Sequence, residues 1–250
     1  MDPMQNPFSP GAGSRPPELA GRDEVLTEAR IALGRIIKQR NAQSQILLGL
    51  RGTGKTVLLN EIERLAEKQQ YLTSFLEAPE KQKLAETLYP QMRQILRKLS
   101  TVESARIAAN MALSGLRNFA SVFKISVGDI EIGVEPTPGS ADSGNLEFDL
   151  TEMFELIGNA ARAARRGWAL LVDEIQYLSE EELAAIIVSI HRISQKNIPI
   201  IFFAAGLPQI ARLSGDAKSY AERLFNFPTI GALPPQAARD AIRNHCEARA

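Results

Sequence analysis

The chain has 250 residues, of which 44% are hydrophobic, enough for one large or two modest globular domains. Lys and Arg number 29, and Asp and Glu also number 29, so no overall charge draws the chain to nucleic acid or to a membrane. The single cysteine, Cys246, excludes an internal disulfide framework and a cysteine-based zinc site. The most apolar run, Ile198 to Leu207, is too short to cross a bilayer. We therefore expect a cytoplasmic protein with no membrane partner.

The first predicted elements surround a glycine-rich loop. Residues 1–17 are rich in Pro, Gly and Ser and predict a flexible arm, and the helix that follows is expected to end near Gln39. The apolar run Gln45 to Leu48 predicts a buried strand. The residues from Val57 predict a helix because their apolar side chains recur on one face. Between them stands Gly49-Leu50-Arg51-Gly52-Thr53-Gly54-Lys55-Thr56, which fits the phosphate-binding pattern G-x-x-x-x-G-K-[ST].

The residue types in this loop suit a nucleoside triphosphate. Gly52 and Gly54 let backbone N–H groups approach phosphate oxygens, and the helix N-terminus adds partial positive charge. Lys55 can reach the β- and γ-phosphates, and the Thr56 hydroxyl can ligate Mg²⁺. The alternative is a strand–helix turn that binds nothing, but the flanking elements favour nucleotide binding. We predict phosphate contacts from Gly49, Arg51, Gly52, Thr53, Gly54, Lys55, Thr56 and Val57.

The middle of the chain predicts an insert at about residues 100–148, because the region between the second strand, Tyr71 to Leu76, and the next strand is long for a sheet crossover. Before the insert we expect a helix from Pro79 to about Leu99 that is broken or kinked near Pro90. Within the insert the expected elements are a helix from Val102 to Phe119, a hairpin of Ser121–Val127 and Ile130–Val134, and a loop from Pro136 to Gly144.

The second half alternates helices with strands, which predicts a parallel sheet covered on both faces. Trp168 to Val172 is continuously apolar and predicts a fully buried strand. The other expected elements are a helix with a capping box of Asp149 and Glu152, a helix with a box of Ser179 and Glu182, a strand from Ile198 to Ala205, a short helix after Gly206, a strand from Leu224 to Ile230, and a helix from Gln236 to Ala250.

An acidic pair, Asp173-Glu174, follows the apolar strand that ends at Val172. A phosphate loop needs a second element to hold magnesium, and an acidic residue at the end of a buried strand supplies it. Asp173 would bind Mg²⁺ through water, and Glu174 would orient and deprotonate the attacking water. A pair of acids that simply enters a loop is the alternative, but the phosphate loop upstream favours the catalytic interpretation.

The run Leu-Leu-Val-Asp-Glu-Ile-Gln after a phosphate loop resembles the AAA+ ATPases. Within them it resembles the group of origin-recognition and replication-initiator ATPases, archaeal-type ATPases and related bacterial ATP-binding proteins. The resemblance runs from about Leu19 to the C-terminus. It implies a three-layer P-loop NTPase fold with a parallel five-stranded sheet, ATP and Mg²⁺ as ligands, and self-association through the nucleotide site.

The same resemblance divides the chain into domains. Residues 18–232 would form the nucleotide-binding α/β domain. Leu233-Pro234-Pro235 resembles the hinge to a helical lid, so residues 233–250 would be the first lid helix. A family lid bundle carries three or four helices and a second-sensor arginine. We therefore expect a fragment that lacks the rest of the lid and any effector domain.

Two segments resemble further parts of the family site. Pro17 to Arg22 resembles the segment that lies against adenine, which implies contacts from Leu19, Ala20 and Arg22, with a helix-entry turn as the alternative. Tyr220 to Phe225 resembles the segment that carries the arginine finger. This implies that Arg223 reaches the γ-phosphate of a neighbouring subunit, with a plain surface arginine as the alternative.

One position departs from the family pattern. The end of the fourth strand normally carries a polar sensor residue, but Ala204-Ala205-Gly206 stand there. Gln176 follows Asp173-Glu174 at the ligand side of the sheet and is a candidate contact to the γ-phosphate or to water, with a helix-entry role as the alternative. The missing polar group argues against fast hydrolysis but not against binding.

The leading hypothesis is an ATPase that hydrolyses ATP to ADP and phosphate to drive a conformational switch. DNA or a protein partner would be engaged by the 100–148 insert or by a further C-terminal domain. The alternative is a slow or non-hydrolysing module that binds ATP or ADP and serves signalling or as a scaffold. A small-molecule kinase is a third hypothesis, but no set of phosphate-gripping arginines is evident. His191 and His245 have no second ligand at metal spacing and are expected to be structural or on the surface.

Overall fold

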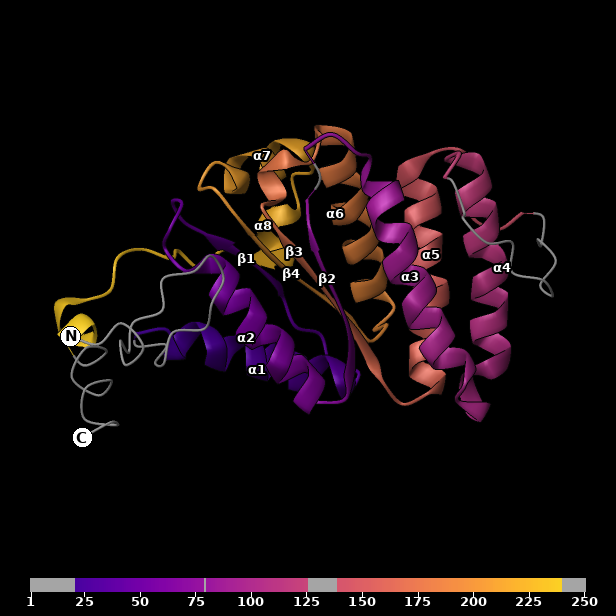
Figure 1. Ribbon diagram of the computed structural model, residues 1–250, viewed down its shortest axis with the longest axis horizontal. Helices are drawn as coiled ribbons and strands as arrows, with labels where there is room; N and C mark the ends of the chain where they lie inside the picture. The colour runs from indigo at the N-terminus through magenta and orange to yellow at the C-terminus, as the bar shows by residue number, and fades with distance from the viewer. Residues whose placement is uncertain (1–20, 79, 126–138, 240–250) are drawn as a thin grey trace, which may run out of the picture.

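The computed structural model describes residues 21–78, 80–125 and 139–239. Its centre is a sheet of five parallel strands in the order β2-β3-β4-β1-β5 (Figure 1). This is the predicted parallel sheet. The strands are β1 (Ser44–Leu48), β2 (Tyr71–Glu77), β3 (Gly167–Asp173), β4 (Ile200–Gly206) and β5 (Phe225–Asn226).

Helices cover both faces of the sheet and complete three layers. Helices α1 and α2 lie on one face, and α3, α5 and α6 lie on the other (Figure 1). Helix α4 packs on α3 and α5, so it lies outside them and away from the sheet. The bounds are α1 (Asp23–Ile37), α2 (Lys55–Lys68), α3 (Leu84–Ser100), α4 (Arg106–Val122), α5 (Leu146–Ala163), α6 (Glu180–Gln195), α7 (Ile210–Ala217) and α8 (Ala221–Leu224), with short 3₁₀ helices η2 (Glu103–Ala105) and η3 (Ile175–Tyr177).

The central strands are fully buried because each carries apolar side chains on both faces. In β3, Leu170 and Val172 join the core under α3, α5 and α6, and Leu171 joins the core under α1 and α2. All seven residues of β3 and of β4 are buried. Two cores on opposite faces of one sheet explain why these runs are apolar throughout rather than alternating.

Two predictions for the insert and its borders are wrong in part. Helix α3 begins at Leu84 rather than at Pro79; it continues through Pro90 without a break, and a kink there stays a prediction. The first strand of the predicted hairpin is absent at residues 121–125. There α4 continues to Val122, and Ile125 N donates to Ala120 O at 2.8 Å across Lys124, whose φ is +52°. This is a left-handed helix end, so the apolar residues close a helix rather than start a strand. Residues 126–134, with the rest of the hairpin, lie outside the described residues.

The predicted capping boxes have opposite outcomes. Ser179 and Glu182 form the box at α6, with both reciprocal hydrogen bonds present, as predicted. At α5 the prediction is wrong, because the helix begins at Leu146 and Asn145 is its N-cap. Asp149 lies inside the first turns and accepts hydrogen bonds from the preceding loop.

The fifth strand is shorter than the predicted Leu224–Ile230. Regular pairing is confined to Phe225–Asn226, after which Leu48 forms a single parallel bridge to Thr229. Pro228 explains the interruption, because proline has no N–H to donate to the sheet. Further along, residues 235–239 are helical, at the start of the helix predicted from Gln236. No helix among the described residues is long and apolar enough to cross a membrane.

Candidate functional site

The glycine-rich loop joins β1 to α2 at the carboxyl edge of the sheet. Gly49 N donates to Gly206 O at 3.1 Å. A Cβ on Gly49 would lie 2.4 Å from Ile230 O and 2.7 Å from Thr53 Oγ1, so only glycine fits between these neighbours. Gly52 and Gly54 have φ values of +78° and +88°, which glycine adopts readily. The loop therefore needs its glycines for both backbone conformation and close contact.

The loop presents positive groups at the start of α2. Lys55 is only 5% exposed, and its Nζ donates to Gly49 O at 3.0 Å and to Leu50 O at 2.9 Å. The N-cap of α2 is Gly54, which offers no side chain to the first N–H groups of the helix. These N–H groups, which include those of Thr56 and Val57, carry the partial positive charge of a helix N-terminus. Lys55 and this terminus together can bind a phosphate chain.

Asp173 joins the end of β3 to the loop. Its Oδ2 accepts a hydrogen bond of 2.5 Å from Thr56 Oγ1, a residue 117 positions away in the sequence. Its Oδ1 accepts Glu174 N at 2.9 Å. A hydroxyl and a carboxylate side by side are hard oxygen donors, which Mg²⁺ prefers. Among the described residues no group of three His, Cys, Asp or Glu could hold a metal ion. Mg²⁺ commonly takes one or two protein oxygens and completes its shell with phosphate and water, and Thr56 and Asp173 fit that pattern.

Glu174 follows Asp173 with a left-handed backbone, at φ +52°. One of its carboxylate oxygens, Oε2, accepts a hydrogen bond from Gln176 Nε2. Gln176 Oε1 in turn accepts Leu207 N at 3.2 Å, just after β4. Thus Asp173, Glu174 and Gln176 all lie at the carboxyl edge, where ligands bind in open parallel sheets.

Arg22, the N-cap residue of α1, also reaches the loop. Its Nη2 donates to Thr53 O at 3.3 Å and to Gly231 O at 2.6 Å. Burial lowers the pKa of this guanidinium below its usual value. Arg22 therefore ties the start of α1 to the loop and to the segment after β5, and its contact with adenine stays a prediction. Leu19 and Ala20 lie outside the described residues.

Arg223 lies at the amino-terminal end of the parallel strands, opposite the carboxyl end that carries the glycine-rich loop. It directly precedes Leu224 and β5, whose Phe225 pairs with Ser44 at the beginning of β1. The glycine-rich loop follows the end of β1, roughly 13 Å away along the strand. Arg223 is exposed, and it lines a hollow of about 430 Å³ with Asn41, His191, Ser194, Gln195, Tyr220 and Leu224. It is thus far from the site in its own chain, and a role in a neighbouring chain stays a prediction.

The family model for the AAA ATPase domain matches residues 18–203. The chain belongs to the AAA ATPase domain family. No curated protein matches it.

Two solved structures show the same fold as this AAA domain. Cdc6p from Pyrobaculum aerophilum has a TM-score of 0.55 at 15% identity, and the match covers 97% of this chain and 53% of that one. The ORC2 protein of Aeropyrum pernix, in its ADP form, has a TM-score of 0.57 at 16% identity, with coverages of 95% and 55%. The chain thus spans about half the length of these solved relatives.

Two features of the AAA domain escaped prediction. Tyr177 accepts a hydrogen bond of 2.8 Å at its hydroxyl from Arg51 Nη2, which links η3 to the glycine-rich loop. Gly206 must be small because a Cβ there would lie 2.7 Å from Ile175 Cγ2 and 3.1 Å from Gln176 Oε1. The sequence carries a weak signal for each. For Tyr177 it is an aromatic residue shortly after Asp173-Glu174, and for Gly206 it is a glycine at the end of the fourth strand, close to where a polar residue was expected.

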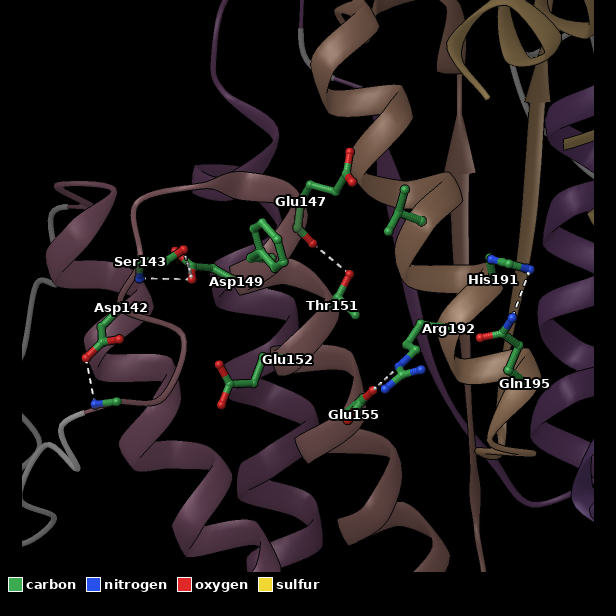
Figure 2. A pocket seen from close by; sticks show the side chains of 13 residues that line it. Asp142, Ser143, Glu147, Asp149, Thr151, Glu152, Glu155, His191, Arg192 and Gln195 are labelled. Atoms are coloured by element: carbon green, nitrogen blue, oxygen red, sulfur yellow. Dashed lines mark hydrogen bonds and ion pairs between the residues drawn. The ribbon is translucent and has the colours of Figure 1, made fainter. Parts of the chain in front are cut away.

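The AAA domain has another hollow, of about 690 Å³, between α5, α6 and the loop before α5. Figure 2 shows Asp142, Ser143 and Asp149 at one end of it and His191 and Gln195 at the other. Its carboxylates accept hydrogen bonds from groups of the protein itself. Asp142 accepts Gly139 N at 2.7 Å, and Asp149 accepts Ser143 N, Ser143 Oγ and Gly144 N at 2.7 to 3.0 Å.

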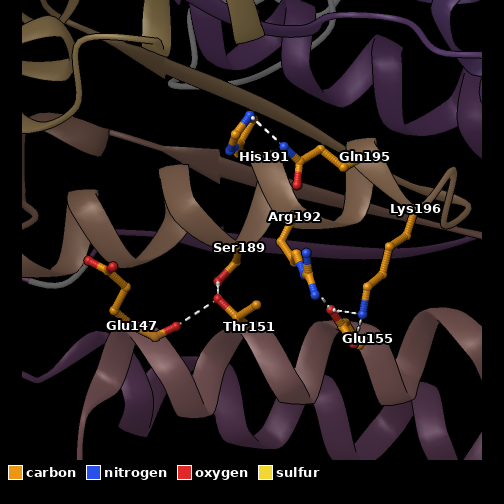
Figure 3. Close-up of polar contacts among 8 residues, drawn as sticks. All are labelled: Glu147, Thr151, Glu155, Ser189, His191, Arg192, Gln195 and Lys196. Carbon is orange, nitrogen blue, oxygen red and sulfur yellow. Dashed lines mark hydrogen bonds and ion pairs between the residues drawn. The ribbon is translucent and has the colours of Figure 1, made fainter.

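Polar contacts between α5 and α6 lie in and beside the same hollow (Figure 3). Glu155 forms ion pairs with Arg192 at 3.2 Å and with Lys196 at 2.6 Å. Thr151 Oγ1 lies 3.0 Å from Ser189 Oγ. These contacts fix α5 to α6, and the hydrogen bonds to Asp149 fix the loop to α5, so the carboxylates around this hollow have a structural explanation.

Proposed function

We propose that this AAA domain is a Mg²⁺-dependent ATPase that hydrolyses ATP to ADP and phosphate and uses the reaction to drive a conformational switch. The observation that supports it most is the 2.5 Å contact between Thr56 Oγ1 and Asp173 Oδ2. It joins a phosphate-binding loop to an acidic strand end, which are the two halves that such hydrolysis needs.

Each residue of the site has one role in this proposal. The loop amides and Lys55 bind the phosphate chain, and Thr56 and Asp173 hold Mg²⁺. The metal, when bound, neutralises charge that develops on the phosphate oxygens. Glu174 takes a proton from a water molecule as the water oxygen bonds to the γ-phosphorus and ADP leaves.

The proposal has four further parts: the adenine contacts, a lid, action between copies, and a partner. Leu19, Ala20 and Arg22 contact the adenine, and residues 233–250 begin a lid that follows the nucleotide state. Arg223 acts on the nucleotide of a neighbouring copy, which its place at the opposite sheet edge from its own loop supports. The insert at about 100–148 engages a DNA or protein partner in the cytoplasm. Its helix α4 exposes 79% of Ile107 and 63% of Met111, which supports a partner on this outer layer.

A second candidate is a slow or non-hydrolysing ATP/ADP module for signalling or scaffolding. It is supported by the end of β4, where Ala204 and Ala205 are fully buried and offer no polar side chain to the site. The two candidates share nucleotide binding and differ only in turnover.

Phosphate release at saturating Mg·ATP separates these candidates. We expect measurable turnover in the wild type. In Glu174→Gln we expect the base to be lost while equilibrium titration still shows ATP binding. Turnover that survives this substitution would contradict the role of Glu174, and a wild type that binds ATP without turnover would favour the second candidate.

The same assay tests the assignment of Arg223. Neither Arg223→Ala nor Lys55→Ala should turn over ATP alone, whereas a mixture of the two should recover activity from mixed interfaces. Full activity of Arg223→Ala alone would contradict action between copies.

A further inference from the structure

Gln176 joins two strand ends through one side chain. It lies in η3, two residues after Glu174, and its Nε2 donates to Glu174 Oε2. Its Oε1 accepts Leu207 N at 3.2 Å, 31 positions along the chain. The orientation of the amide group follows from these partners, because a backbone N–H can only donate and an ionised carboxylate can only accept. The Gln176 oxygen must therefore face Leu207.

The bridge depends on a small residue at the end of β4. Gly206 has no side chain, and a Cβ there would lie 3.1 Å from Gln176 Oε1. Ala204 and Ala205 before it are fully buried and apolar. The end of β4 is therefore linked to Glu174 by two hydrogen bonds in series, from Leu207 N to Gln176 and from Gln176 to Glu174.

The anchor point of this bridge is fixed to the glycine-rich loop. Gly206 O accepts Gly49 N at 3.1 Å, so Leu207 follows directly after the residue that contacts the first glycine of the loop. Through Gln176, the Glu174 carboxylate is thus held relative to the loop that binds phosphate. The same turn leads into α7, and then into α8 with Arg223.

We infer that Gln176 is a positioning residue for Glu174. It holds the carboxylate against the β4–α7 turn and provides the polar link that the side chains of β4 lack. This inference rests on the proposed role of Glu174 as the base. It adds that the orientation of the base depends on the position of the β4–α7 turn, because Leu207 in that turn supplies the anchoring N–H.

Kinetics of Gln176→Leu and Gln176→Glu test the inference. Leucine has a similar size and makes neither hydrogen bond, whereas glutamate retains an acceptor for Leu207 N and repels Glu174. For both variants we expect kcat to fall about 10- to 100-fold, because a misplaced base loses the reacting geometry. KM and the ATP affinity should stay within about twofold, since Gln176 positions the base rather than the phosphates.

A matched control is Gln69→Leu, which removes a glutamine directly after the end of α2 that donates to Arg30 O instead. It should leave kcat unchanged. A normal or raised kcat in Gln176→Leu, or a loss of ATP affinity as large as the loss of kcat, would overturn the inference.

Hydrogen exchange provides a test that does not depend on turnover. The Leu207 amide should exchange faster in Gln176→Leu, which has no acceptor, and should remain protected in Gln176→Glu. Equal protection in wild type and Gln176→Leu would overturn the bridge. Unchanged turnover in Glu174→Gln would instead contradict the proposed function. Loss of turnover in Glu174→Gln combined with a normal kcat in Gln176→Leu would overturn the positioning role alone.

Discussion

Two buried aspartates, Asp149 and Asp173, have similar settings and different partners. Asp149 is 1% exposed in the first turns of α5, and Asp173 is 5% exposed at the end of β3. Asp149 accepts three hydrogen bonds from Ser143 and Gly144. Asp173 accepts one from the Thr56 hydroxyl and one from the adjacent Glu174 N.

The kind of donor separates a structural carboxylate from a candidate functional one. All donors to Asp149 belong to the loop that it holds in place, within six residues of it in the sequence. The Thr56 hydroxyl comes from a distant element and can itself be a metal ligand. Burial of a charge is therefore not enough to indicate a ligand site, and the partner groups decide. Substitutions at these two aspartates and at other residues of the site and the helix ends test this distinction.

The largest expected effect is that of Asp173→Asn on turnover. On the proposed role of Asp173 as a Mg²⁺ ligand, its loss removes several kcal/mol of transition-state stabilisation, so phosphate release should fall at least about 1,000-fold. The free energy of unfolding should change by less than about 1 kcal/mol, because the asparagine oxygen can still accept Glu174 N while its amide nitrogen donates to the Thr56 hydroxyl oxygen, which can accept as well as donate. Urea unfolding and phosphate release on the same preparation measure both effects. A destabilised variant with normal turnover per folded molecule would make Asp173 structural.

Asp149→Ala should show the reverse. It leaves the N–H groups of Ser143 and Gly144 without their acceptor, so we expect a loss of about 3 kcal/mol in the free energy of unfolding. ATP affinity should stay within about twofold of wild type. Asp142→Ala is the control, because the Asp142 side chain is exposed and accepts a single N–H, and it should cost less than about 1 kcal/mol. Loss of ATP binding at full stability in Asp149→Ala would refute the structural assignment.

Gly49→Ala should lower both the free energy of unfolding and the affinity for ATP. The added Cβ meets Ile230 O, a backbone atom, at 2.4 Å, so the loop must shift. We expect about 2 kcal/mol of destabilisation from overpacking, together with weaker ATP binding. Gly231→Ala is the matched control, because a Cβ there meets nothing within 4 Å. If Gly49→Ala keeps wild-type stability and affinity, the close contact at Gly49 is not required.

Ser179→Ala should have the smallest effect. It removes the Ser179 hydroxyl that accepts Glu182 N at 3.2 Å, so we expect a loss of about 1 kcal/mol in urea unfolding and no change in ATP affinity. The contrast with Asp149→Ala distinguishes an exposed helix cap from a buried carboxylate that organises a loop. Equal losses in the two variants would remove that distinction.

Much of the sheet was predictable because its signals are local. Apolar runs mark β3 and β4, and a shorter one, Ile46 to Leu48, ends β1; the glycine-rich loop and Asp173-Glu174 each follow such a run. The carboxyl ends of parallel strands share one edge, so the sequence also predicted that the loop and the acidic pair lie together. The Thr56–Asp173 contact agrees with that prediction.

The errors and omissions involve contacts between distant residues. Asp149 resembles a helix cap in sequence, but its role depends on a loop that folds back over α5. Ser121 to Ile125 have strand-like composition, yet the left-handed Lys124 ends α4 there. The bridge from Gln176 to Leu207 spans 31 positions and needs a glycine at position 206, so no local pattern could predict it.

The central claim is that the glycine-rich loop and Asp173 form one Mg²⁺-dependent ATP site. Equilibrium titration of the wild type with ATP, with and without Mg²⁺, tests it most directly, with Asp173→Asn measured alongside. We expect Mg²⁺ to strengthen ATP binding in the wild type and most of this gain to be lost in Asp173→Asn. ATP affinity that is the same with and without Mg²⁺ in the wild type, or an equal Mg²⁺ effect in both proteins, would contradict it.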